Sequence, residues 1–240
     1  METIDWSKYP AVRNTTSYPT RFDEKRFTIQ QLREAASRAE VLFRGWPFIY
    51  YNYDPDATHI IGDGLETVVN QESRKAEPII EQWNLLQSGA FLHRTVMSEL
   101  HDPQGKGQRV LDVTETIYHV AEAIGSLWRL YEALAVPDEE DVTIEFVYED
   151  TKDRELVELH PRRNRRFDLL PRWNSWNKCF APKVEISRTL PLQIWRASDA
   201  QIAAEICVEI FQQFQWEPSL RQIEEEIRPF LGRLAPSSVR

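Results

Sequence analysis

Apolar residues recur at helical spacing in five stretches of the chain, and each stretch predicts an amphipathic helix. A capping-box pattern begins the first, where Thr28 precedes Gln31, and another begins the last, where Ser219 precedes Gln222. Pro137 and the acidic residues after it end the longest. The predicted helices are residues 28–45, 78–100, 113–134, 202–214 and 219–232.

Short runs with alternating or aromatic residues predict strands between these helices. The glycines of HIIGDG at 59–64 indicate a hairpin turn. Pro191 cannot donate a ladder hydrogen bond, so its strand is expected at an edge or a bulge. The predicted strands are residues 46–53, a strand including 65–69, an antiparallel hairpin over 142–159, and residues 184–195. Hairpins alternating with helices predict an α+β fold, with antiparallel β-hairpins packed on amphipathic helices in a single domain.

The domain boundaries follow from where periodicity begins and ends. Residues 1–26 mix prolines, hydroxyl residues and charges without a period, and we expect them to form an extended N-terminal arm. Residues 27–232 form the predicted single domain, and residues 233–240 a flexible tail.

Composition narrows the class of protein. The chain has 240 residues, a formal net charge of −9 and two cysteines. An acidic chain is a poor general binder of nucleic acid, although a local basic patch can still bind it. Two cysteines without a metal-binding or disulfide pattern, no signal peptide and no long apolar run predict a cytoplasmic protein that does not enter a membrane. No cofactor motif is found, and none is expected.

The most distinctive stretch is HPRRNRRFDLLPRWNSWNK at 160–178, where arginines stand beside aromatic residues. Guanidinium groups bind carboxylates and phosphates, and aromatic rings stack on bases. We expect this segment to bind an acidic protein partner; nucleic acid, or no partner at all, remains open. Its candidate binding residues are Arg162, Arg163, Arg165, Arg166, Arg172, Trp173 and Trp176.

Two further groups could carry chemistry. Glu115, His119 and Glu122 fall on one face of the longest predicted helix, where they could bind a metal. No second Glu-x-x-His pair accompanies them, so a solvated or partner-facing surface is favoured and no metal site is assigned. His93 and His101 could serve in acid–base work, but no nucleophile at a fixed spacing accompanies them, and His93 is favoured as structural.

Three strings resemble a known region: RGWPF at 44–48, WNLLQSGAFLH at 83–93 and VTETIYHVAEAIGSLWRL at 113–130. They are similar to the C-terminal region of bacterial proteins that carry an N-terminal AlbA-type DNA-binding domain of the Schlafen group. The matching positions are Trp83, Gln87, Ser88, Gly89, Phe91 and His93. The resemblance implies no catalytic residue, and these positions are expected in a ligand pocket or in a packing seam between helices.

Few residues precede the shared region, so the resemblance implies a stand-alone module without that N-terminal domain. We therefore expect a non-enzymatic binding or regulatory subunit of a bacterial complex, with a separately encoded protein partner. Regulation and anti-phage defence are the roles expected for such a complex. The alternative is a metal- or His-dependent hydrolase acting on nucleic acid or a nucleotide. Homo-oligomerisation is a third interpretation.

Overall fold

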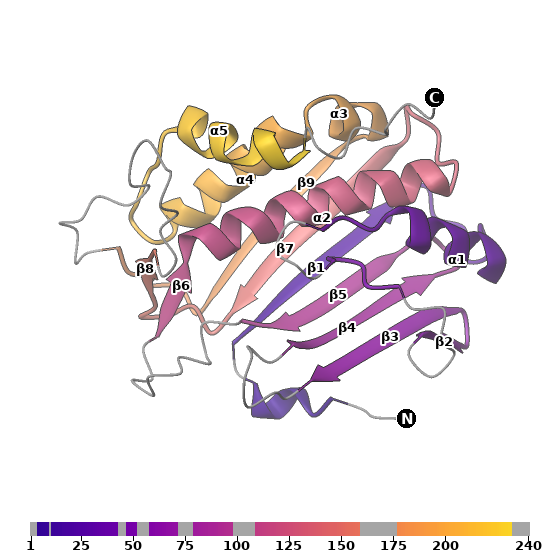
Figure 1. Cartoon of the computed structure of the whole chain (residues 1–240), viewed down its shortest axis with the longest axis horizontal. Helices are drawn as coiled ribbons and strands as arrows, with labels where there is room; N and C mark the ends of the chain where they lie inside the picture. The colour runs from indigo at the N-terminus through magenta and orange to yellow at the C-terminus, as the bar shows by residue number, and fades with distance from the viewer. Residues whose placement is uncertain are drawn as a thin grey trace.

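The computed structural model describes residues 4–9, 11–42, 47–51, 58–71, 79–97, 109–158 and 177–231. Within these residues one antiparallel sheet carries helices on one face (Figure 1), so the predicted α+β class is confirmed. In order across the sheet, the seven strands are β2 (Thr58–Ile61), β3 (Gly64–Gln71), β4 (Ile79–Leu86), β5 (Phe91–Val96), β1 (Val12–Pro19), β7 (Asp141–Glu149) and β9 (Lys183–Pro191). A separate parallel pair joins β6 (Val110–Asp112) to β8 (Glu155–Val157).

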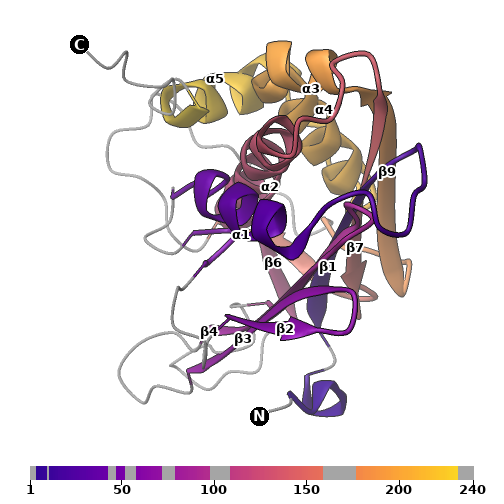
Figure 2. The ribbon, with the colours of Figure 1, turned by 90° about the vertical axis from the view of Figure 1, so that its right-hand side faces the viewer.

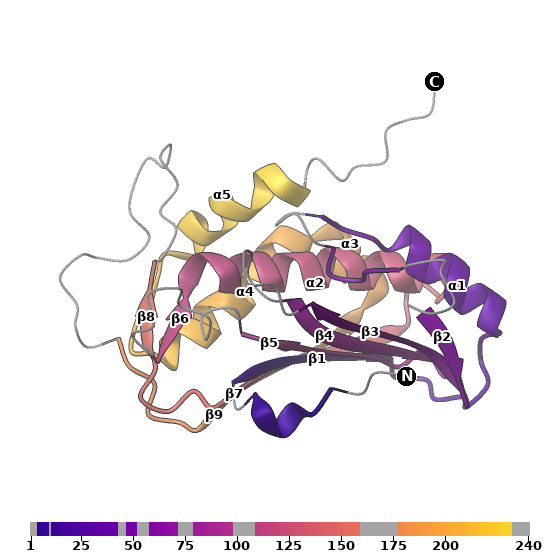
Figure 3. The same cartoon turned by 60° about the horizontal axis from the view of Figure 1, so that its bottom comes forward.

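The long helix α2 crosses the sheet, and Figure 2 shows it nearly end-on between α1 and α4. The helices are α1 (Ile29–Arg38), α2 (Val113–Ala133), α3 (Leu192–Ala197), α4 (Asp199–Gln212) and α5 (Leu220–Leu231). Residues Trp6–Lys8 form a short 3-10 helix, η1, that lies against the opposite face of the sheet (Figure 3). In the part of the chain that the structure describes, every helix is too short or too polar to cross a membrane.

Alternation along the strands builds the core. Inward residues such as Trp83, Leu85 and Phe91 are fully buried beneath the helices. α2 faces them with a run of buried residues from Val113 to Leu127. On the other face a smaller cluster joins Val12, Ile80 and Val96, packed against Ile4, Trp6 and Tyr9. The main core therefore lies between the sheet and α2.

The predicted N-terminal arm is wrong over residues 12–19. Residues 12–19 form β1, which pairs with β5 on one side and with β7 on the other. The side chains of Arg13, Thr15 and Ser17 point inward and are buried. An inner strand with polar inward positions has no apolar alternation, so its sequence does not look like a strand.

The helix predicted for residues 78–100 is also wrong, because residues 79–96 form the β4–β5 hairpin. Paired apolar residues such as Leu85 and Leu86 satisfy both a helical and a strand period. The deciding feature is the turn at residues 87–90, where Gly89 has φ +89°. A left-handed glycine between two alternating runs favours a hairpin.

Of the other predicted helices, strands and turns, some are confirmed and some are wrong. The turn within HIIGDG, the strand after it, the capping box at Thr28 and the edge position of Pro191 are confirmed, but the strand that enters this turn is β2 and not residues 46–53. The hairpin over 142–159 is wrong, because β7 pairs with β1 and β9 while β8 pairs with β6. Residues 47–51, the described part of the predicted 46–53 strand, are bends and coil. The predicted first helix ends early, at Arg38, and α3 replaces the end of the 184–195 strand.

We predict that a chain starting at residue 27 does not fold. It lacks β1, so β5 and β7 each lose a neighbour in the middle of the sheet. A chain starting at residue 10 keeps β1 and is the matched control. Circular dichroism on heating should show a cooperative transition for the control and none for the shorter chain. A cooperative transition in both would contradict an internal role for β1.

We predict that Gly89→Ala lowers the free energy of unfolding by about 1–3 kcal/mol. An added Cβ would lie 2.9 Å from Phe27 and 3.3 Å from Pro19, on a residue with positive φ. Gly62→Ala is the control, since nothing lies within 4 Å of its Cβ position, and we expect a change within about 0.5 kcal/mol. Urea denaturation measures both, and equal losses would argue against the left-handed turn.

Candidate functional site

Several predicted site residues lie outside the described part of the chain. These are His101, Arg162, Arg163, Arg165, Arg166, Arg172, Trp173 and Trp176. The structure describes the residues on both sides of the segment 159–176, which are Glu158 and Asn177. The surroundings of these two positions are therefore where a site linked to the arginine-rich segment can be sought.

The six residues of the family pattern lie in the β4–β5 hairpin, not in a seam between helices. Trp83 and Phe91 are fully buried, and the Trp83 indole Nε1 donates to the Tyr50 carbonyl at 3.0 Å. The Gln87 side chain donates to the Phe27 carbonyl at 2.9 Å, and the Ser88 hydroxyl accepts from the Ala90 amide at 3.3 Å. These contacts fix the hairpin turn against the core.

Gly89 ties the same turn to α2. The hydroxyl of Tyr131 lies 3.2 Å from the Gly89 carbonyl and 3.0 Å from the Ser17 hydroxyl. Burial raises the pKa of this phenol, which stays neutral and available as a hydrogen-bond donor. A packing role therefore accounts for Gly89. A side chain there would meet Phe27 and Pro19, which explains why the residue is glycine.

His93, the last residue of the pattern, belongs to a buried group of polar side chains between the sheet and α2. Its Nε2 lies 3.4 Å from the Glu81 carboxylate, and both side chains are almost fully buried. The ring of Phe48 lies 4.5 Å from the His93 ring, and the ring of His119 lies 6.3 Å from it. The predicted structural role fits this position, although His93 is on a strand and not on a helix.

His119 and Glu122 overturn the prediction of a solvated helix face. They are 1% and 0% exposed, respectively, and the Nε2 of His119 lies 3.3 Å from the hydroxyl of Thr15 on β1. The face of α2 that carries His119 packs on the polar inward side of β1. Sequence alone cannot show this, because it depends on which strand lies beneath the helix.

This buried group does not form a metal site among the described residues, where no three His, Cys, Asp or Glu side chains are grouped to hold an ion. Its members come from β1, β4, β5 and α2 and are packed with aromatic rings. Buried polar groups that hydrogen-bond across elements fix register and specificity in a core. We assign the group to the architecture of the protein.

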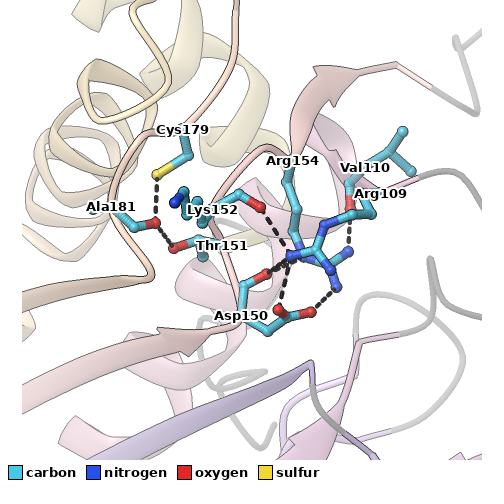
Figure 4. Close-up of polar contacts among 8 residues, drawn as sticks. All are labelled: Arg109, Val110, Asp150, Thr151, Lys152, Arg154, Cys179 and Ala181. Atoms are coloured by element: carbon cyan, nitrogen blue, oxygen red, sulfur yellow. Dashed lines mark hydrogen bonds and ion pairs between the residues drawn. The ribbon is translucent and has the colours of Figure 1, made fainter.

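A second polar group lies at the rim of the molecule, where the β7–β8 turn meets the start of β6. Arg109 and Arg154 both bind Asp150, and Figure 4 shows the two guanidinium groups converging on this carboxylate. Arg109 Nη2 donates to Asp150 Oδ1 at 2.7 Å and to the Lys152 carbonyl at 2.8 Å. Arg154 Nη2 donates to Asp150 Oδ2 at 3.0 Å.

Arg154 fixes the rim to the rest of the fold. Its side chain is 1% exposed, and its Nη1 donates to the Val110 carbonyl of β6 at 3.0 Å. Its Nε donates to the Asp150 carbonyl at 2.7 Å. Asp150 and Asp153 have φ near +56° and +62°, a conformation that aspartate tolerates better than most residues. The tight turn thus places Asp150 where it can hold both arginines.

The charge of Asp150 depends on these arginines. Burial alone raises the pKa of the carboxyl, but hydrogen bonds from Arg109 and Arg154 outweigh it and leave the pKa below its ordinary value. Asp150 is therefore ionised at neutral pH. One carboxylate between two guanidinium groups leaves one positive charge uncompensated within the triad.

A pocket of about 420 Å³ opens beside this triad. It is lined by Arg109, Val110, Asp153, Glu155, Val157 and Lys178. Val157 and Lys178 stand close to the two ends of the segment 159–176, and Arg109 directly follows the segment 98–108, which also lies outside the described residues. We call this region, with the triad, the rim site.

No protein-family model, curated protein or solved structure matches this chain. The rim site is therefore interpreted from its own residues.

Sequence reasoning missed the rim site. The string EDTKDRE at 149–155 predicts a turn, but nothing in it indicates that Asp150 binds an arginine 41 residues earlier in the chain. The one available signal was the density of charge in a short turn next to an arginine-rich segment. The burial of Arg154 could not be predicted from the sequence, because it depends on the pairing of β6 with β8.

We predict that Asp150→Asn lowers the free energy of unfolding by about 1–3 kcal/mol at neutral pH, because buried Arg154 loses its charged acceptor. Asparagine also tolerates positive φ, so the turn is kept. Asp153→Asn, in the same turn with the same backbone geometry, is the matched control.

The pH dependence of this difference has a definite sign. A carboxyl whose pKa is lowered on folding stabilises the protein fully above its unfolded pKa, near 3.8, and loses that contribution as the pH falls through the lower folded pKa. Urea titrations of wild type and Asp150→Asn should differ by a constant amount above about pH 5 and converge in acid. A difference that grows in acid would contradict the triad.

Proposed function

We propose that this chain is a non-enzymatic binding subunit that captures an acidic protein partner at the rim site. The observation that carries the proposal is the charged pocket beside Asp150, lined by residues close to both ends of the arginine-rich segment. A pocket with convergent charged groups is a default binding site. The proposal includes the resemblance to the C-terminal region found with the AlbA-type domain, and a separately encoded partner in bacterial regulation or defence.

The local charge supports an acidic partner. At the rim, Arg109, Arg154 and Lys178 are balanced by three carboxylates, those of Asp150, Asp153 and Glu155. The segment 159–176 adds five arginines and a single aspartate in its sequence. This basic stretch stands in a chain whose formal net charge is −9, so it is the part that attracts an acidic surface.

A binding role also agrees with how the rim is held. Arg154 is fixed by hydrogen bonds to Asp150 and to the Val110 carbonyl of β6, and Asp150 in turn binds Arg109, so Arg109 is placed without contributions from a partner. Preorganised charged groups lose less conformational freedom on binding than flexible ones. The His-dependent hydrolase has weaker support, because the pocket lining includes neither His93 nor His119.

We predict that replacing Arg162, Arg163, Arg165 and Arg166 with Ser lowers partner recovery by about tenfold or more, since each charged contact at an interface contributes on the order of 1 kcal/mol. The measurement is a tagged pull-down from the native host, analysed by mass spectrometry and by nucleic-acid extraction. The control replaces Lys8, Arg21, Lys25 and Arg38, all exposed, with Ser, which removes the same charge elsewhere.

A stoichiometric protein retained by the control and lost by the arginine variant supports the proposal. Recovery of nucleic acid without a protein overturns it. So does a protein recovered equally with both variants, because the arginine-rich segment would then have no part in binding.

A further inference from the structure

Residues 177–181 run beside β8 as a short extended segment that pairs with it through an isolated antiparallel bridge, and we call this segment the short strand. The Leu156 amide donates to the Asn177 carbonyl at 2.9 Å, and the Cys179 amide donates to the Arg154 carbonyl at 3.0 Å. The Asp153 amide donates to the Cys179 carbonyl at 2.8 Å, and Lys178 bridges Glu155 in antiparallel orientation. The order across the rim is therefore β6, β8 and residues 177–181.

Among the described residues, no strand pairs with the far side of this short strand, which is an open edge. In an antiparallel ladder the N–H and C=O groups of alternate residues point to opposite sides. Asn177 and Cys179 use theirs on β8, so those of Lys178 and Phe180 point away from it. Within the described chain no backbone hydrogen bond uses the amide or carbonyl of Lys178 or Phe180.

This edge differs from the β9 edge of the main sheet. β9 carries Lys183, Glu185 and Pro191, residues of the kind that discourage pairing with another chain. Residues 177–181 instead present Phe180, whose side chain is 70% exposed. An exposed aromatic ring on an open strand edge is typical of a surface that accepts an added strand.

The pocket lies on the same side of the short strand as the Phe180 ring. Lys178 lines the pocket, and alternate residues of a strand share one face, so Lys178 and Phe180 point to the same side. A strand added at this edge would lie beside Lys178 and Phe180, with Glu155 one strand further away. Its neighbouring side chains would thus meet an ammonium group and an aromatic ring, with Arg109 across the pocket and the carboxylates of Asp153 and Glu155 in the same lining.

We propose that the partner binds as an extended acidic peptide that adds a strand to residues 177–181. Its backbone bonds the amides and carbonyls of Lys178 and Phe180. A carboxylate side chain enters the pocket toward Lys178 and Arg109, and an apolar side chain covers the Phe180 ring. This inference rests on the proposed function and specifies the conformation and chemistry of the partner segment.

The test uses the full chain, labelled with ¹⁵N, and a synthetic peptide, acetyl-Thr-Glu-Thr-Val-Thr-Glu-amide, in which Glu and Val alternate along one face. We expect it to shift the amide signals of Lys178 and Phe180 and to bind with a dissociation constant below about 1 mM. The same peptide N-methylated at every residue cannot form a ladder on that edge in either orientation, and a peptide with Lys for Glu has the wrong charge. Both should bind at least about tenfold more weakly.

Lys178→Glu should weaken binding of the acidic peptide by about tenfold or more, and Lys25→Glu, an exposed charge reversal elsewhere, should leave it unchanged. Equal binding of the N-methylated peptide overturns the inference, as does the absence of shifts at Lys178 and Phe180 at about 1 mM peptide.

The outcome separates this inference from the proposed function. If the peptide fails at the edge while the four-arginine variant still loses its partner, the chain is a binding subunit that uses side chains alone. If the peptide binds at the edge and the four-arginine variant keeps its partner, the strand edge stands and the role of the arginine-rich segment falls.

Discussion

The fold depends on the pairing of β1 with two strands that come much later in the chain. β5 lies on one side of it and β7 on the other, so β1 joins the four strands β2–β5 to the C-terminal strands β7 and β9. Each side of β1 contributes a ladder of backbone hydrogen bonds in the middle of the sheet, where water cannot replace them. Without β1 the sheet would divide into two parts, each with an exposed edge, and α2 would have no continuous surface to cover.

The inward face of β1 also explains why the core is partly polar. Arg13, Thr15 and Ser17 are buried beneath α2. His119 and Tyr131 of α2 lie within hydrogen-bond distance of Thr15 and Ser17, respectively. Buried polar groups are costly unless they are paired, so this interface tolerates only one register of β1 against the helix. His119 and Glu122 are buried in this core, although their spacing along α2 suggested a metal site or a solvated surface. Their role is therefore structural.

The rim site is attached to this core by short connections. β6 leads directly into α2 through Asp112, whose side chain caps the helix, and the β7–β8 turn carries Asp150. Both connections are held by Arg154, a buried cation whose hydrogen bonds reach β6 and the turn together. The pocket and the open strand edge of residues 177–181 therefore belong to one fixed unit. Such a unit can present backbone and charged groups to a partner at a small cost in conformational entropy.

The sequence by itself determined the α+β class, the capped start of α1, the extent of α2, the turn between β2 and β3 and the edge position of Pro191, because each depends on residues close together in the chain. It also drew attention to the arginine-rich segment next to the rim site. Only the tertiary structure decided that residues 12–19 form an inner strand, that residues 79–96 form a hairpin, and that Arg109, Asp150 and Arg154 meet. These features depend on pairing between distant segments, and a polar strand or a doubled leucine has the same local pattern whichever partner it finds.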